Sequence, residues 1–376
     1  MLADLFSERF RAPVECSIEV RGRPITSLYP FLREARVELS RDRVGVATLV
    51  FDTRRDESGR WTVQDAEVLA PWEPILIEAR FGQRTEEVLR GFVREVRADY
   101  PEDMGTARVT VSCQDESLAM DREHVRRVWG AEVPTSDGVL LAEIAARHGL
   151  AVDPTSGAGL SGLVVPQDST DIRFLRARAE ANGYELLVRG GVIYFGPMRL
   201  DAEPQPTLRV YAGLDTHCRA LSVTTDGHRP NTVAVDLAPL SGAEPRRQEV
   251  TPDLPLLGTR QAHGGHEGRD FTWLLTREGA VDEEELLARA RRKANDFSLR
   301  VRAEGELDGT AYGHVLKVGQ PVGVDGVGEW LGGIYYVDAV THVFSHDGYR
   351  QGLRLLRNAY GDNLGGGALN VLGGLL

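Results

Sequence analysis

Apolar and polar side chains alternate along much of this chain, as they do in strands that bury one face. In residues 14–21, valine, cysteine and isoleucine alternate with glutamate, serine and arginine. Alternation or short apolar runs predict further strands at 36–40, 47–52, 75–81, 107–113, 208–212, 221–225, 233–237 and 299–305. Many short strands with turns between them are typical of a β-sandwich or a β-barrel.

Two distant segments share one layout. Residues 321–358 predict a strand followed by a β-hairpin, and residues 74–115 repeat that order. The matching positions are Pro74 with Pro321, Val93 with Val337 and Val96 with Val340. We interpret the two segments as a diverged duplication of one β unit. A chain with two such units can place six similar surfaces around a threefold axis.

The region between the two segments has a helical pattern. Residues 136–148 carry leucine, isoleucine and alanine on one helical face, after a capping serine and before a glycine. A second helix is predicted from about residue 170 to 182. Two strands follow, and Gly190-Gly191 between them fits a tight hairpin turn. This region therefore predicts a small α+β domain.

The second half of the chain contains a long polar stretch and one clear helix. Residues 239–271 are rich in glycine and proline, and we expect either a surface loop or an arm that wraps a neighbouring subunit. Residues 282–297 begin with acidic side chains and end with basic ones around an apolar stripe, which predicts an amphipathic helix. The tail from Gly361 combines glycines with leucines, and we expect it to order only against a partner.

These patterns predict a mainly β (α+β) fold with two related β-barrel-like domains flanking the small α+β domain. The expected boundaries are 1–124 for the first β domain, 125–200 for the α+β domain, 201–360 for the second β domain and 361–376 for the flexible tail.

Composition and charge exclude several classes of function. The formal net charge is −12 and the pI is about 5.3, which argues against broad binding to nucleic acid. The three cysteines lie far apart, as expected for buried free thiols in a reducing compartment. We found neither a secretory signal nor an apolar run long enough to cross a membrane, so we expect no membrane insertion and synthesis in the cytoplasm.

The sequence offers no residue set for catalysis. His263 and His266 are the most closely spaced histidine pair, but they lie among glycines in a polar stretch, so we reject them as a metal site. The chain lacks the common motifs of serine hydrolases, zinc proteases and nucleotide-binding enzymes. We therefore expect no catalytic residues, no cofactor and no metal.

Four stretches together resemble the late control gene D proteins of contractile-tailed phages and the hub part of type VI secretion VgrG proteins. The stretches are VREVRADY and VTVSCQDESLAMDR within 93–122, LAEIAARHGL at 141–150, QDSTDIRFLRARAEANGYE at 167–185, and GGIYYVDAVTHVF at 332–344. Their order and spacing, rather than any single motif, carry the resemblance.

The resemblance implies a non-enzymatic baseplate hub, in which a homotrimer joins a hexameric tail tube to a trimeric spike. The implied partners are a tail tube protein, a separate spike protein and other baseplate proteins, within a virion or a phage-tail-like particle. Candidate contact residues are Arg300 and Arg302, which we expect on the outward face of their strand as partners in intersubunit ion pairs, and the tail residues Leu369, Leu372 and Leu375. Two alternatives stay open, namely a baseplate-associated cell-wall hydrolase and a free-standing glycan- or protein-binding β module.

Overall fold

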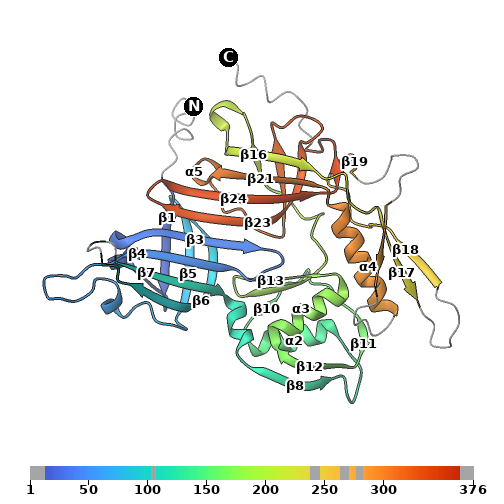
Figure 1. Ribbon diagram of the computed structural model, residues 1–376, viewed down its shortest axis with the longest axis horizontal. Coiled ribbons are helices and arrows are strands. Elements are labelled where there is room, and N and C mark those ends of the chain that lie inside the picture. Colours follow the sequence, from blue (N-terminus) through green and yellow to red (C-terminus); the bar gives the residue numbers. More distant parts are fainter. Residues whose placement is uncertain are drawn as a thin grey trace.

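One 13-stranded sheet runs through most of the protein (Figure 1). The computed structural model describes residues 13–102, 105, 107–237, 246–262, 271–276 and 283–364. Along the main path the strand order is β16-β21-β24-β23-β3-β4-β7-β6-β5-β1-β2, with β15 and β22 joined beside β23. The fold is therefore mainly β, as the alternation predicted.

The first β unit occupies one end of this sheet. Its strands are β1 (Glu15–Val20), β2 (Arg23–Pro24), β3 (Leu32–Ser40), β4 (Val46–Asp52), β5 (Pro74–Phe81), β6 (Arg84–Asp99) and β7 (Arg108–Asp115). Short 3-10 helices lie at Thr26–Phe31, Gln64–Ala66 and Glu116–Asp121. Alternate residues such as Val37, Leu49 and Val111 are fully buried and form the core, which explains the period of two in the sequence.

The second β unit continues the same sheet from the C-terminal half of the chain. Its strands are β15 (Gln205–Arg209), β16 (Cys218–Thr225), β21 (Val301–Asp308), β22 (Pro321–Asp325), β23 (Gly333–Ser345) and β24 (Gly348–Arg357). A short helix, α5 (Gly309–Tyr312), follows β21, and a 3-10 turn lies at Gly213–Asp215. A separate apolar core, which includes Tyr335 and Leu355, fills this unit.

A small α+β domain is inserted between the two units. Its elements are β8 (His124–Trp129), β9 (Thr135–Ser136), α2 (Asp137–Arg147), β10 (Ala151–Val152), β11 (Ser161–Leu163), β12 (Val165–Thr170), α3 (Asp171–Asn182), β13 (Glu185–Arg189) and β14 (Val192–Gly196). Both predicted helices and the glycine hairpin are present, with φ at +61° for Gly190 and +75° for Gly191. Buried Asp137 ties the helices together, because it accepts hydrogen bonds from Arg178 Nε at 2.6 Å and Asn182 Nδ2 at 2.7 Å.

A further insertion separates β16 from β21. It contains β17 (Thr232–Leu237), β18 (Arg246–Val250), β19 (Arg260–Gln261), β20 (Thr272–Leu275) and α4 (Glu283–Ser298), and β19 pairs with the late strand β25 (Ala359–Tyr360). The stretch 239–271 is therefore not a plain loop, since its described part holds β18 and β19. Side chains of α4, β17 and β18 share an apolar core of their own. We define residues 226–300 as the insertion module.

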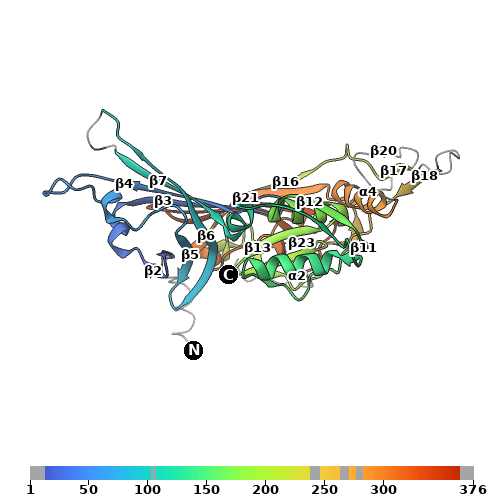
Figure 2. The same ribbon diagram turned by 90° about the horizontal axis from the view of Figure 1, so that it is seen from below.

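The molecule is elongated, with the first β unit and the insertion module at opposite ends (Figures 1 and 2). The α+β domain lies beside the sheet and reaches the insertion module through contacts between α3 and α4. No helix in the described ranges is long and apolar enough to span a bilayer.

His342 is a buried histidine on β23, with no exposed surface. Its Nδ1 lies 2.9 Å from the Tyr349 hydroxyl, and its Nε2 has no hydrogen-bond partner among the described residues. Desolvation by burial lowers the pKa of His342 from 6.5 to about 3. The ring is therefore neutral in the folded protein.

This burial predicts a pH dependence of stability. The folded state binds fewer protons at His342 than the unfolded state at pH values between the two pKa values, so the free energy of unfolding should fall as the pH falls below about 6.5. Replacing His342 with leucine should flatten this slope by up to about 1.4 kcal/mol per pH unit in chemical denaturation. His346→Ala, at an exposed turn residue, is the matched control. An unchanged slope in His342→Leu would contradict the assignment.

Candidate functional site: the joint between the two β units

The two β units have the same strand register, which the sequence match only suggested. Pro74 of β5 lies opposite Phe92 of β6, and Pro321 of β22 lies opposite Tyr336 of β23. The matched valines Val93 and Val337 follow at the next position in each long strand. Strands β3, β4, β5, β6 and β7 therefore correspond to β16, β21, β22, β23 and β24.

Irregularities of the backbone recur at the same places in both units. The pairing of β6 with β7 shifts between Val93 and Glu95, and that of β23 with β24 shifts between Val337 and Ala339. Trp72 and Gly319 both adopt left-handed backbone, at φ of +72° and +75°. Each donates its N–H to the carbonyl of the matched valine, at 2.7 and 2.9 Å. Shared bulges are specific features of a backbone, so they support the duplication strongly.

The joint between the units is a pair of antiparallel strands from opposite ends of the chain. β3 pairs with β23 from Glu34 opposite Ser345 to Ser40 opposite Ala339. Figure 1 shows these two strands side by side in the middle of the sheet. Backbone hydrogen bonds along this pair make the two units one continuous sheet rather than two tethered domains.

Apolar packing accompanies the strand pairing. Phe344 and Tyr349 of the second unit lie in the core of the first unit, where their rings stack at 4.2 Å between centroids. Val315 also enters this core, and its N–H donates to the Glu86 carboxylate of β6 at 2.8 Å. The joint is thus stabilised by both backbone pairing and a shared core.

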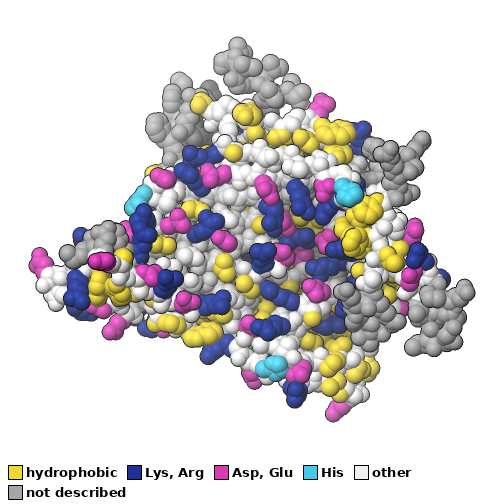
Figure 3. Space-filling model, viewed as in Figure 1, with side chains coloured by type: hydrophobic (Ala, Val, Ile, Leu, Met, Phe, Trp, Pro, Cys, Tyr) yellow, Lys and Arg dark blue, Asp and Glu magenta, His cyan; other side chains and the backbone are white. Residues whose placement is uncertain are grey.

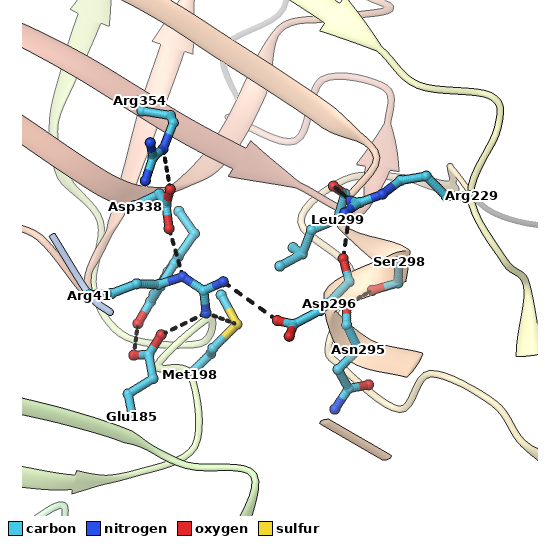
Figure 4. Close-up of polar contacts among 11 residues, drawn as sticks. Arg41, Glu185, Met198, Arg229, Asn295, Asp296, Ser298, Leu299, Asp338 and Arg354 are labelled. Atoms are coloured by element: carbon cyan, nitrogen blue, oxygen red, sulfur yellow. Dashed lines mark hydrogen bonds and ion pairs between the residues drawn. The ribbon is translucent and has the colours of Figure 1, made fainter. Parts of the chain in front are cut away.

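Arg41 lies at the end of β3 and joins four parts of the protein (Figure 4). Its Nε donates to Asp338 Oδ1 on β23 at 2.6 Å, and its Nη1 donates to Glu185 Oε1 of the α+β domain at 3.2 Å. Its Nη2 lies 3.5 Å from Asp296 Oδ1 of α4. Arg354 of β24 also donates to Asp338. We name Arg41, Glu185, Asp296, Asp338 and Arg354 the Arg41 cluster.

The electrostatics of the Arg41 cluster follow from burial. Burial alone would lower the pKa of Arg41, but the carboxylates of Glu185, Asp296 and Asp338 outweigh it and raise that pKa. Desolvation raises the pKa of Glu185, although Arg41 and the Tyr336 hydroxyl, which donates to it at 2.6 Å, oppose that rise. The guanidinium stays charged and holds its acidic partners in place. Because each partner comes from a different element, the cluster fixes their relative positions.

The exposed face of the sheet carries mixed charge. Basic and acidic side chains alternate across the face seen in Figure 3, without a patch of one sign. Cross-strand pairs such as Arg350 with Glu306 at 3.7 Å contribute to this pattern. A mixed face does not provide the positive surface that nucleic acids need.

The candidate contact arginines have different surroundings. Arg300 was expected to face outward, but it is buried, and its Nη2 donates to the carbonyls of Arg229 and Pro230 at 2.6 and 3.0 Å. The start of the insertion module covers this side chain, which strand alternation could not reveal. Arg302 is exposed on β21, and its role in an intersubunit pair stays a prediction.

The other predicted residues give less information. His263, His266, Leu369, Leu372 and Leu375 lie outside the described residues. Cys16, Cys113 and Cys218 are free thiols. No group of three or more metal-ligating side chains occurs within the described ranges.

Arg41→Met tests the joint. Removing the cation leaves Glu185 and Asp338 buried with fewer partners, so we expect the free energy of unfolding to fall by about 3 kcal/mol near neutral pH. The loss should shrink as the pH falls, because burial raises the pKa of Glu185 and its carboxyl then takes up a proton more readily. Arg36→Met is the matched control, since Arg36 is an exposed β3 arginine paired with exposed Glu38. Equal losses in the two variants, measured by denaturant unfolding, would contradict a special role for Arg41.

Comparisons with solved structures agree with this architecture. The 43 kDa tail protein of prophage MuSo2 from Shewanella oneidensis superposes with a TM-score of 0.68 at 13% identity, covering 92% of this chain and 98% of that one. The tail protein from Neisseria meningitidis MC58 gives 0.64 at 15% identity, covering 92% and 97%. The E. coli c3393 protein, described as a type VI secretion system component with structural similarity to T4 tail proteins, gives 0.57 at 13% identity, covering 92% and 79%.

These structures confirm, at the level of fold, the resemblance to tail and type VI hub proteins. A search of curated proteins found no match. A family model described as the Alg8 N-terminal domain matches residues 11–223, which is more than half of the sequence. The chain therefore belongs to the Alg8 N-terminal domain family and has the fold of phage tail proteins.

Proposed function

We propose that this chain is a structural baseplate hub of a contractile injection machine, where a homotrimer adapts a hexameric tail tube to a trimeric spike. The observation that carries the proposal is the shared register of the two β units, including their bulges and their left-handed residues. Units with the same backbone can offer the same contacts to identical tube subunits. Three chains with two units each supply the six positions that a hexameric tube requires.

The joint supports this proposal because an adaptor must hold its two units at one angle. The β3–β23 pairing, the shared core and the Arg41 cluster oppose hinge motion between the units. A flexible linker would let each unit move on its own, and the six positions would lose their regular spacing. A rigid joint also suits a part that carries mechanical load during contraction.

Similarity of fold favours a structural role over the two alternatives. Two solved structures that this chain matches over nearly their whole length are described as tail proteins. A free-standing binding module gives no reason for two units in one continuous sheet. Assembly into a virion or a phage-tail-like particle, with tube, spike and other baseplate proteins as partners, follows from the proposed role.

The first prediction of the proposal concerns the solution mass of the chain. Light scattering after size exclusion should give about 124 kDa, three times the 41.3 kDa of one chain. An obligate interface of this kind should keep the mass constant on dilution, because such interfaces bury thousands of Å². A monomer that hydrolyses peptidoglycan or binds glycans would instead favour an alternative function.

The C-terminal tail is the proposed contact for the spike. Deleting residues 365–376, which include Leu369, Leu372 and Leu375, should abolish co-purification with the spike protein. The truncated chain should still have the solution mass of a trimer. The deletion should spare Asn363, whose Oδ1 accepts a hydrogen bond from the Ile334 N–H at 2.9 Å. Unchanged co-purification of the truncated chain would reject the tail as the spike contact.

A further inference from the structure

β16 ends the 13-stranded sheet and leaves one edge without a partner strand among the described residues. Residues 220–225 of this strand read Ala-Leu-Ser-Val-Thr-Thr, without a charge or a proline. Exposed edges in monomeric proteins are usually protected by charged residues, prolines or short length. The opposite end of the sheet is protected in this way, because β2 has two residues, Arg23 and Pro24. The β16 edge therefore has the character of a strand that pairs with another chain.

A second open edge lies on β6. The pairing of β5 with β6 stops at Phe92, whereas β7 continues along the other side of β6 to Asp99. Beyond Val93, the side of β6 on which β5 lies has no partner strand within the described ranges. In the second unit the matching side of β23 is occupied, because β3 pairs there.

The repeat relates these two edges to each other. β6 corresponds to β23 and β16 corresponds to β3 through the common registers. Inside one chain, β3 pairs with the edge of β23. The corresponding edge of β6 has no partner strand among the described residues. β16, which corresponds to β3, likewise has one edge that is unpaired among the described residues. A second copy of this chain carries the missing partner for each.

We propose that β16 of one copy pairs antiparallel with β6 of a neighbouring copy, in the register in which β3 pairs with β23. Val340 opposite Leu39 and Val343 opposite Arg36 fix that register. Transferred through the repeat, it pairs Val96 with Thr225, Arg97 with Thr224, Ala98 with Val223, Asp99 with Ser222 and Tyr100 with Leu221. This is a contact between two copies of one chain, and it needs no further molecule.

The side chains on both strands fit this register. Val96 and Ala98 pack at the margin of the first core, and Leu221 and Val223 pack at the margin of the second, so the proposed pairs bring apolar faces together. Tyr100 is 56% exposed in the single chain, and Leu221 would cover it in the proposed pair. The corresponding residue of the second unit, Phe344, lies opposite Ala35 and is buried. Slipping the register by one residue would place apolar side chains on the polar face.

The geometry of this contact is head-to-tail. Each copy contributes two different surfaces, so the assembly either closes into a ring or grows as a filament. Closure with three copies rests on the proposed hub function, whereas the register itself follows from the repeat alone. The two claims can therefore fail separately.

Four cysteine substitutions test the register, namely Arg97→Cys, Asp99→Cys, Ser222→Cys and Thr224→Cys. Directly opposite residues are close enough for a disulfide, whereas diagonal ones are about 7 Å or more apart. The full chain with the pair 97 and 224, or 99 and 222, should cross-link under mild oxidation about tenfold faster than with the swapped pair 97 and 222, or 99 and 224. Variants that carry only one of the four added cysteines control for cross-links through the native thiols of Cys16, Cys113 and Cys218.

Non-reducing gels and light scattering separate the outcomes. A covalent trimer from the in-register pairs, and little from the swapped pairs, is the expected result. A 124 kDa particle in which no pair cross-links would overturn the edge pairing and leave the hub proposal intact. A ladder of long covalent chains would support the edge pairing and overturn closure with three copies. A monomer that never cross-links, or equal rates for matched and swapped pairs, would overturn the register.

Discussion

The pairing of β3 with β23 is the constraint on which the rest of the structure depends. It joins strands about 300 residues apart in sequence and makes one sheet from two β units. The Arg41 cluster reinforces it, since one guanidinium contacts carboxylates of β23, the α+β domain and α4. Such a partly buried charge network is weak evidence for high stability, but breaking it leaves the buried carboxylates of Glu185 and Asp338 with less compensating charge. Its main effect is that the parts have one relative arrangement.

The two units differ most in one of their matching connections. The insertion module extends the connection between β16 and β21, whereas the matching connection between β3 and β4 spans only residues 41–45. The short connection carries Arg41 and lies at the joint. The long one begins where β16 leaves the sheet, and it has a core of its own. Additions at that point leave the two units and their common register unchanged.

Local features of the fold, hairpins included, could be predicted from the sequence, but partners of strands far apart in the chain could not. Alternation located most strands, helical spacing located α2, α3 and α4, and the Pro74–Pro321 match revealed the repeat. The alternation of apolar and polar residues locates β3 but does not identify β23 as its partner, because the two strands lie far apart in the sequence. The same limit explains why Arg300 seemed to face outward, although the insertion module buries it. The Arg41 cluster was missed because its members are scattered, and an arginine just after a strand gives no signal of burial.

The central claim is that a rigid pair of like β units converts threefold into sixfold symmetry. Native mass spectrometry of the chain, co-expressed with a candidate tail tube protein, tests this claim most directly. We expect a complex of three chains with six tube subunits, since the proposed hub would bind one subunit through each unit. A complex with equal numbers of the two proteins would contradict it, because only one unit of each chain would then contact the tube.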